Sequence, residues 1–220
     1  AVHGTAVVSL LIGREESRVP GLVPGAEVVA VDVFRADQGE ERANVVDLVE
    51  GLDLLAGRAL RVYALSLAGP ENAVLARMLD RLTDPEGLDA VVVAAAGNGG
   101  PTAGVAWPAG HPRVLAVTAV DRRGRVYGAA QRGDHLALAA PGVGLLAATS
   151  LRGAREKTGT SFAVPFVTAA AALIVGSGAT GDEARQALTA SASDLGAPGR
   201  DAVFGHGLLS LDRLCGSQAE

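Results

Sequence analysis

The sequence has few aromatic residues, one cysteine and no long apolar run. Aromatic residues make up only 3% of the 220 residues, so the core must rest on the aliphatic side chains that dominate the 49% hydrophobic fraction. Cys215 stands alone, which excludes an internal disulfide, and no Cys and His residues have the spacing of a zinc site. No apolar run reaches the roughly 20 residues that span a bilayer. We expect one domain over residues 1–220, with no cofactor, no metal and no membrane span.

The sequence also lacks an excess of positive charge. Its formal net charge is −5, and no basic stripe is present that could displace counterions from phosphates. A nucleic-acid partner is therefore not expected. A nucleotide-binding α/β domain is a further alternative, but neither glycine cluster near a predicted strand (residues 98–100 and 142–144) completes a dinucleotide or phosphate-loop pattern.

Strand-like and helix-like stretches alternate along the chain, which is typical of a parallel sheet with crossover helices. Apolar spacing predicts helices over residues 3–13, 42–56, 71–83, 161–175 and 182–192. Apolar runs predict strands over residues 27–34, 61–67, 89–95 and 113–120, and residues 121–150 should form short strands and turns. The fold class is thus α/β with a mostly parallel central sheet.

Three short motifs carry groups for acyl transfer. They are His3-Gly4-Thr5, Ala96-Gly97-Asn98 and the run from Gly159 to Pro165 that contains Ser161. A serine hydroxyl is a poor nucleophile until a base takes its proton, and His3 can be that base. The oxyanion formed on the attacked carbonyl needs oriented donors, which the Asn98 side chain and the backbone N–H of Ser161 can supply.

Each motif also has a purely structural interpretation. In one interpretation, Ser161 is no more than the N-cap of the apolar helix that follows it. Asn98-Gly99 is in itself a strong turn signal. The combination of the three motifs favours catalysis over these interpretations. His111, His135 and His206 lie in predicted loops without a comparable context, and we expect them to be structural.

In their order and wording, the three motifs resemble those of the subtilisin-like serine proteases (subtilases, peptidase S8 family), and the resemblance extends from Val2 to about Leu214. It implies a three-layer α/β/α fold and a hydrolase, a serine endopeptidase that acts through an acyl-enzyme on Ser161. It also implies a polypeptide substrate and an extracytoplasmic or secreted setting.

The resemblance further implies a substrate pocket. Ser66, Leu67 and Ala68 resemble the strand end that pairs with the substrate backbone, although Ala68 replaces a family glycine. Ala96 and Gly97 belong to the facing wall. Ala106 stands at the pocket floor, where the family often has glycine, so the pocket should be slightly shallower and suit an apolar or medium-sized residue before the scissile bond.

The family triad begins with an aspartate on a strand upstream of the histidine, and only Ala1 and Val2 precede His3. We therefore interpret residues 1–220 as the C-terminal portion of a subtilase domain, N-terminally incomplete, whose partner is an upstream segment carrying the aspartate. Asp32 ends a predicted strand, but its segment resembles a non-catalytic family strand. Without the aspartate we expect weak activity. The alternatives are a non-catalytic subtilase-like module and a transpeptidase on the same fold.

Overall fold

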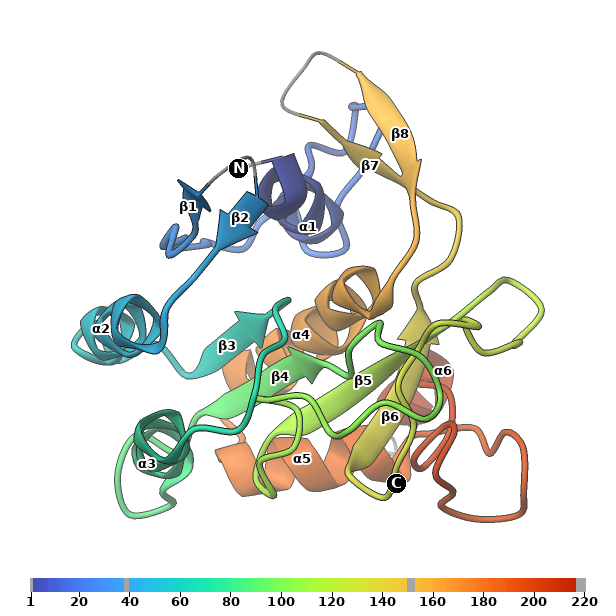
Figure 1. Ribbon diagram of the computed structural model, residues 1–220. Helices are drawn as coiled ribbons and strands as arrows, with labels where there is room; N and C mark the ends of the chain where they lie inside the picture. The colour runs from blue at the N-terminus through green and yellow to red at the C-terminus, as the bar shows by residue number, and fades with distance from the viewer. Residues whose placement is uncertain (1, 38–39, 150–152, 217–220) are drawn as a thin grey trace.

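The computed structural model describes residues 2–37, 40–149 and 153–216. Its centre is a sheet of four parallel strands in the order β3 (Val62–Leu65), β4 (Val91–Ala95), β5 (Leu115–Val120) and β6 (Leu136–Pro141). Helices cover both faces, which confirms the three-layer α/β/α prediction (Figure 1).

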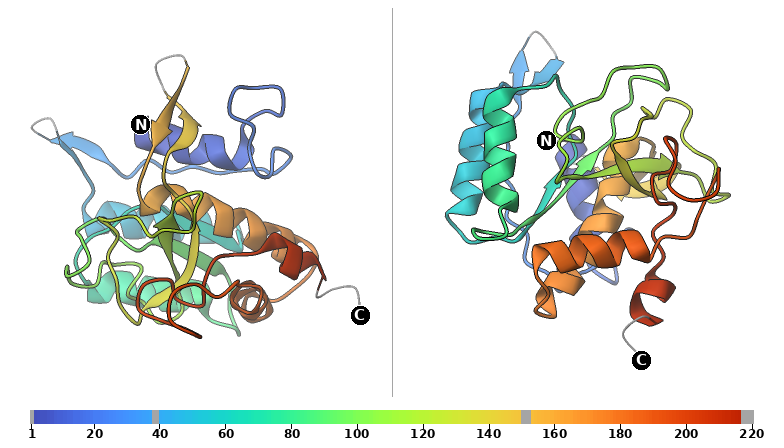
Figure 2. Two further views of the ribbon diagram at one scale, coloured as in Figure 1. Left: turned by 90° about the vertical axis from the view of Figure 1, so that its right-hand side faces the viewer. Right: turned by 90° about the horizontal axis from the view of Figure 1, so that it is seen from below.

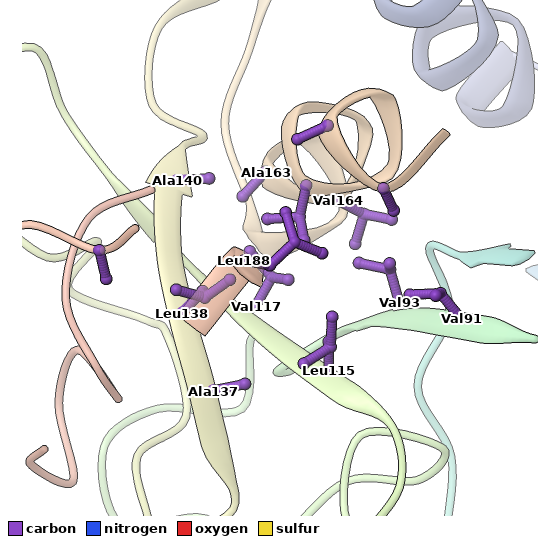
Figure 3. Packing of buried hydrophobic residues seen from close by; sticks show 14 of the residues in the cluster. Val91, Val93, Leu115, Val117, Ala137, Leu138, Ala140, Ala163, Val164 and Leu188 are labelled. Atoms are coloured by element: carbon purple, nitrogen blue, oxygen red, sulfur yellow. The ribbon is translucent and has the colours of Figure 1, made fainter. Parts of the chain in front are cut away.

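The period of two in a strand separates the core into two halves. In β4 the side chains of Val91, Val93 and Ala95 pack with α4 (Thr160–Gly176) and α5 (Gly181–Ala190), whereas Val92 and Ala94 pack on the opposite face. Figure 3 shows the first half, in which Val93 and Val117 face Val164 of α4. Every residue of β4 is buried, as expected for a parallel strand covered on both faces.

The second half lies under α2 (Val45–Ala56) and α3 (Ala73–Thr83), which run side by side in Figure 2. Both helices start at asparagine caps: Asn44 Oδ1 accepts from the Asp47 N–H at 2.8 Å, and Asn72 Oδ1 accepts from the Val74 N–H at 2.9 Å. A cap satisfies backbone donors that the first turn leaves unpaired. Their local sequences thus explain where these helices begin.

A third cluster joins α1 (Val2–Ile12) to the rest of the molecule. Ala6, Val7 and Leu10 of α1 pack with Ala147 of the hairpin β7 (Leu145–Ala148) and β8 (Ala154–Lys157), and with Phe162 of α4. Figures 1 and 2 show α1 and the hairpin together at one end, beyond α4. This packing holds α1 against the first turn of α4.

Most predicted elements are present, with ends shifted by a few residues. The expected strand at residues 27–34 is wrong: these residues form no ladder, and the chain first pairs in the short hairpin β1 (Arg35–Asp37) and β2 (Glu40–Arg42). A strand requires a neighbour for its backbone groups, and none of the described strands pairs with this segment. The structure adds α6 (Leu211–Gly216), which the sequence pattern did not predict. In the described part of the chain, no helix has the length and apolarity to cross a membrane.

Candidate active site

Ser161 lies in the first turn of α4, directly after Gly159 and Thr160. Gly159 has a φ of 148°, a backbone conformation that residues other than glycine rarely adopt. The Ser161 side chain is almost buried; its Oγ donates to the Ser66 carbonyl oxygen at 3.3 Å, and Ser66 Oγ donates to the Ser161 carbonyl oxygen at 2.9 Å. The predicted nucleophile and the predicted substrate strand are therefore in direct contact.

Asn98 follows β4 and is held by Thr160. Asn98 Oδ1 accepts from the Thr160 backbone N–H at 3.0 Å and from Thr160 Oγ1 at 3.2 Å. Thr160 Oγ1 in turn accepts from the Gly97 N–H at 3.1 Å. With the carbonyl side of its amide occupied, Asn98 is exposed and its Nδ2 makes no hydrogen bond to any described residue. The donor needed at an oxyanion site is thus oriented and accessible.

Thr160 is a site residue that the sequence analysis missed. Its side chain is fully buried and joins the end of β4 to the start of α4. In the sequence, a threonine at this position looks like an ordinary helix-capping residue. The only available signal was its position beside Ser161.

His3 lies in the first turn of α1, and its ring packs on Phe162, the residue after Ser161. The two ring centroids are 5.3 Å apart and the planes are tilted by 45°. His3, Asn98 and Ser161 line the same cavity. The three predicted catalytic residues therefore line one cavity.

The predicted pocket segments are also joined. Gly69, after Ala68, pairs with Trp107, after Ala106, through two backbone hydrogen bonds of 2.8 and 2.9 Å. Ser66, Leu67, Ala68 and Gly97 line the cavity, and Ala106 is buried beside Gly97. The described lining of the cavity includes neither Ala106 nor Ala96, and Ala96 is fully buried in the core under α2 and α3.

The cavity has a volume of about 1030 Å³ and continues past the catalytic residues between β3 and residues 27–34. β3 is the edge of the four-stranded sheet on this side. Two hydroxyl groups at its walls, Tyr63 and Thr168, are buried without a hydrogen-bond partner among the described residues, and burial raises the pKa of Tyr63 to about 12. The result is a mostly apolar slot with a few polar groups.

The remaining histidines are absent from the described lining of this cavity. His111 is buried; its Nε2 lies 3.1 Å from an Asp80 carboxylate oxygen, and its Nδ1 accepts from the Arg113 N–H. Burial lowers the pKa of both His135 and His206. These surroundings support the structural roles expected for the three side chains. Asp32 does line the slot, and its Oδ1 accepts from the Phe34 N–H at 3.1 Å.

Comparison with known proteins agrees with these observations. The sequence model of the Subtilase family matches residues 1–207. The chain belongs to the subtilase family. Among curated relatives, Subtilisin BL of Lederbergia lenta is 32% identical over 174 residues, which are 78% of this chain and 62% of the relative. Minor extracellular protease Epr of Bacillus subtilis is 26% identical over 210 residues, which are 94% of this chain and 32% of the relative.

The solved structure of the prenylagaramide maturation protease PagA superposes on this subtilase with a TM-score of 0.85 at 26% identity. The superposition covers 97% of this chain and 82% of that one. The curated relatives are longer, and this chain spans less than two thirds of the length of either. The match therefore covers only part of the length of these two relatives.

Proposed function

We propose that the chain supplies the nucleophile, the general base and the oxyanion donor of a serine endopeptidase. The observation that carries the proposal is the arrangement of Thr160, which fixes the Asn98 amide beside Ser161 at a helix start. The N-terminus of α4 adds the unpaired backbone N–H groups and partial positive charge of a first helical turn. Negative charge that develops next to Ser161 would be stabilised there.

In the proposed reaction, Ser161 Oγ leaves its hydrogen bond with the Ser66 carbonyl and attacks the carbonyl carbon of a peptide bond. His3 takes the hydroxyl proton, and the carbonyl oxygen becomes an oxyanion between Asn98 Nδ2 and the Ser161 N–H. Collapse breaks the C–N bond, and the leaving amine takes the proton from His3. Water, activated by His3 in the same way, then releases the acid and restores Ser161.

The proposal includes an upstream segment that carries an aspartate and occupies the slot. Its support is the lining of the slot, which includes β3, an edge strand of the four-stranded sheet, and residues 27–34, which pair with none of the described strands. An apolar strand between them would satisfy backbone groups on both walls and cover the apolar lining. An aspartate at its end would hold the imidazole of His3 in the tautomer that accepts the serine proton.

We further propose a polypeptide substrate and an extracytoplasmic setting. Support comes from the relatives, one of which is named an extracellular protease. The non-catalytic and transpeptidase alternatives have no specific observation in their favour. All three motifs are intact.

A fluorophosphonate probe tests the proposal. In the protein supplied with its upstream segment, the probe should label Ser161, and Ser161→Ala should abolish labelling. The matched control is Ser177→Ala at the other end of α4, where the hydroxyl donates to the Ile174 carbonyl. Labelling that persists in Ser161→Ala, or that disappears in Ser177→Ala alone, would contradict the assignment.

A further inference from the structure

A buried glutamine connects the two segments assigned to the substrate pocket. Gln131, in the loop between β5 and β6, is only 6% exposed. Its backbone N–H donates to the Gly97 carbonyl oxygen at 3.0 Å, and its side-chain Nε2 donates to the Gly104 carbonyl oxygen. Gln131 thus holds the wall at Gly97 against the loop that leads to Ala106.

The other end of the amide lies beside Gly97, a residue of the described cavity lining. Gly97 has a φ of 105°, and a Cβ on this residue would lie 1.7 Å from Gln131 Oε1 and 3.2 Å from the Ala106 Cβ. Oε1 therefore occupies the space beside the Gly97 Cα, between the predicted wall and the predicted floor. A substrate side chain that reached this part of Gly97 would meet the glutamine amide.

Gln131 Oε1 has no hydrogen-bond donor among the described residues. Its Nε2 is committed to Gly104, so the orientation of the amide leaves the oxygen as the open end. Oε1 does not belong to the fully buried polar atoms without a partner, so solvent reaches it, and a group that covers it without donating a hydrogen bond costs free energy. The structure therefore presents an acceptor where a substrate side chain would arrive.

We propose that Gln131 determines specificity: it limits the depth of the pocket and selects a small residue with a hydroxyl donor, foremost serine, before the scissile bond. This inference rests on the proposed function and narrows the expected apolar or medium-sized residue. A serine hydroxyl reaches Oε1 and satisfies it. A leucine meets the amide sterically and leaves Oε1 unpaired, and unpaired polar groups are an effective way to reject a substrate.

Two substitutions separate the effect of Gln131 on the depth of the pocket from the effect of its hydrogen-bond acceptor. Gln131→Met keeps a side chain of similar length and removes the acceptor, whereas Gln131→Ala removes both. Peptides that differ only in Ser, Ala or Leu before the scissile bond are compared by kcat/KM in protein that the fluorophosphonate labels. Gln186→Ala, an exposed glutamine of α5, is the matched control and should leave the profile unchanged.

The protein should cleave after serine about tenfold better than after alanine or leucine, the size of discrimination that one side-chain contact provides. Gln131→Met should remove the preference for serine over alanine and still reject leucine. Gln131→Ala should raise cleavage after leucine about tenfold. The inference would be overturned if the unsubstituted protein, Gln131→Met and Gln131→Ala all ranked the three peptides in the same order of kcat/KM.

Peptide binding to the Ser161→Ala protein, followed by the fluorescence of the single tryptophan Trp107, separates this inference from the proposed function. Serine-dependent binding that Gln131→Met abolishes supports the inference even in the absence of Ser161 labelling. Binding without preference for serine, or no binding of any peptide, overturns it. Labelling of Ser161 together with binding that lacks this preference leaves the proposed function standing alone.

Discussion

Two valine-rich runs in this chain have opposite fates. Residues 91–95 form β4, which pairs with a strand on either side and is buried throughout. Residues 27–34 have a similar apolar sequence, yet they form no ladder and none of them is buried. Val31 and Val33 pack against Gly51 of α2, where a Cβ would lie 3.2 and 3.1 Å from their Cγ1 atoms.

The difference shows that side-chain preference is a weak determinant of a strand. β-propensity mostly describes how well a side chain fits a pleated, half-buried surface, and that surface has to exist. β4 has neighbours at both edges, whereas residues 27–34 face the slot. The same comparison bears on catalysis, because Asn98 follows the end of β4 and His3 lines the slot.

The largest expected effect comes from filling the slot. Adding the upstream segment in trans should raise kcat for peptide hydrolysis by about 10⁴, the order of the loss measured in subtilisin itself on removal of the aspartate. It should also protect the backbone amides of residues 28–33 from hydrogen exchange, because they gain a partner, while the amides of β4 stay as they are. Peptide assays and exchange mass spectrometry measure the two effects.

An upstream segment with its aspartate replaced by asparagine is the control for filling the slot. It should protect residues 28–33 without restoring activity, which separates the strand from the carboxylate. Full activity of residues 1–220 alone would instead show that this chain supplies the carboxylate, and Asp32→Asn would then be the next variant.

The next effect concerns the end of β4. Asn98→Ala should lower kcat about 10²- to 10³-fold with little change in KM, because a donor to the oxyanion acts mainly in the transition state; the magnitude is one measured in subtilisin. Steady-state kinetics on the protein with its upstream segment provide the check. A rise in KM at constant kcat would assign Asn98 to substrate positioning instead.

A pair of valine substitutions sharpens the structural comparison. Val93→Ala removes a fully buried side chain from β4 and should lower the free energy of unfolding by about 2 kcal/mol, whereas Val31→Ala should cost below about 1 kcal/mol. Urea unfolding followed by Trp107 fluorescence measures both. After the slot is filled, the cost of Val31→Ala should rise toward that of Val93→Ala; equal costs before filling would contradict the distinction.

The smallest effect is the titration of Tyr63, at the edge of the slot. Burial raises the pKa of Tyr63 to about 12. Between pH 10 and 12 the unfolded chain loses the phenol proton and the folded chain keeps it, so the free energy of unfolding should fall as pH rises through this window. Chemical denaturation at several pH values tests the slope, and Tyr63→Phe should reduce it.

The sequence predicts five of the helices and the strands β3, β4 and β5 because apolar spacing is a local signal, whereas β6 falls in the residues expected to form short strands and turns. The continuous apolar run of β4 is such a signal. The caps Asn44 and Asn72 were not used, and the predicted helices start at residues 42 and 71 instead of 45 and 73. Residues 27–34 were mispredicted because a strand requires a pairing partner, and no local pattern shows whether one is present.

The candidate site likewise contains residues that the sequence predicts and residues that it does not. His3, Asn98 and Ser161 stand in recognisable motifs, and the structure places them around one cavity. The roles of Thr160 and Gln131 depend on contacts between segments far apart in the sequence, since Thr160 bonds to Gly97 and Gln131 to Gly104. A single buried threonine or glutamine carries no pattern of its own.

The hydrogen bonds of Thr160 have a thermal consequence. The first turn of α4 carries Ser161 and also holds the amide of Asn98, so fraying of that one turn would misplace the nucleophile and release the oxyanion donor together. The two groups form a single cooperative unit, and neither can be lost gradually while the other survives. Heat inactivation should accordingly follow the melting of this turn in one step, ahead of the sheet beneath it.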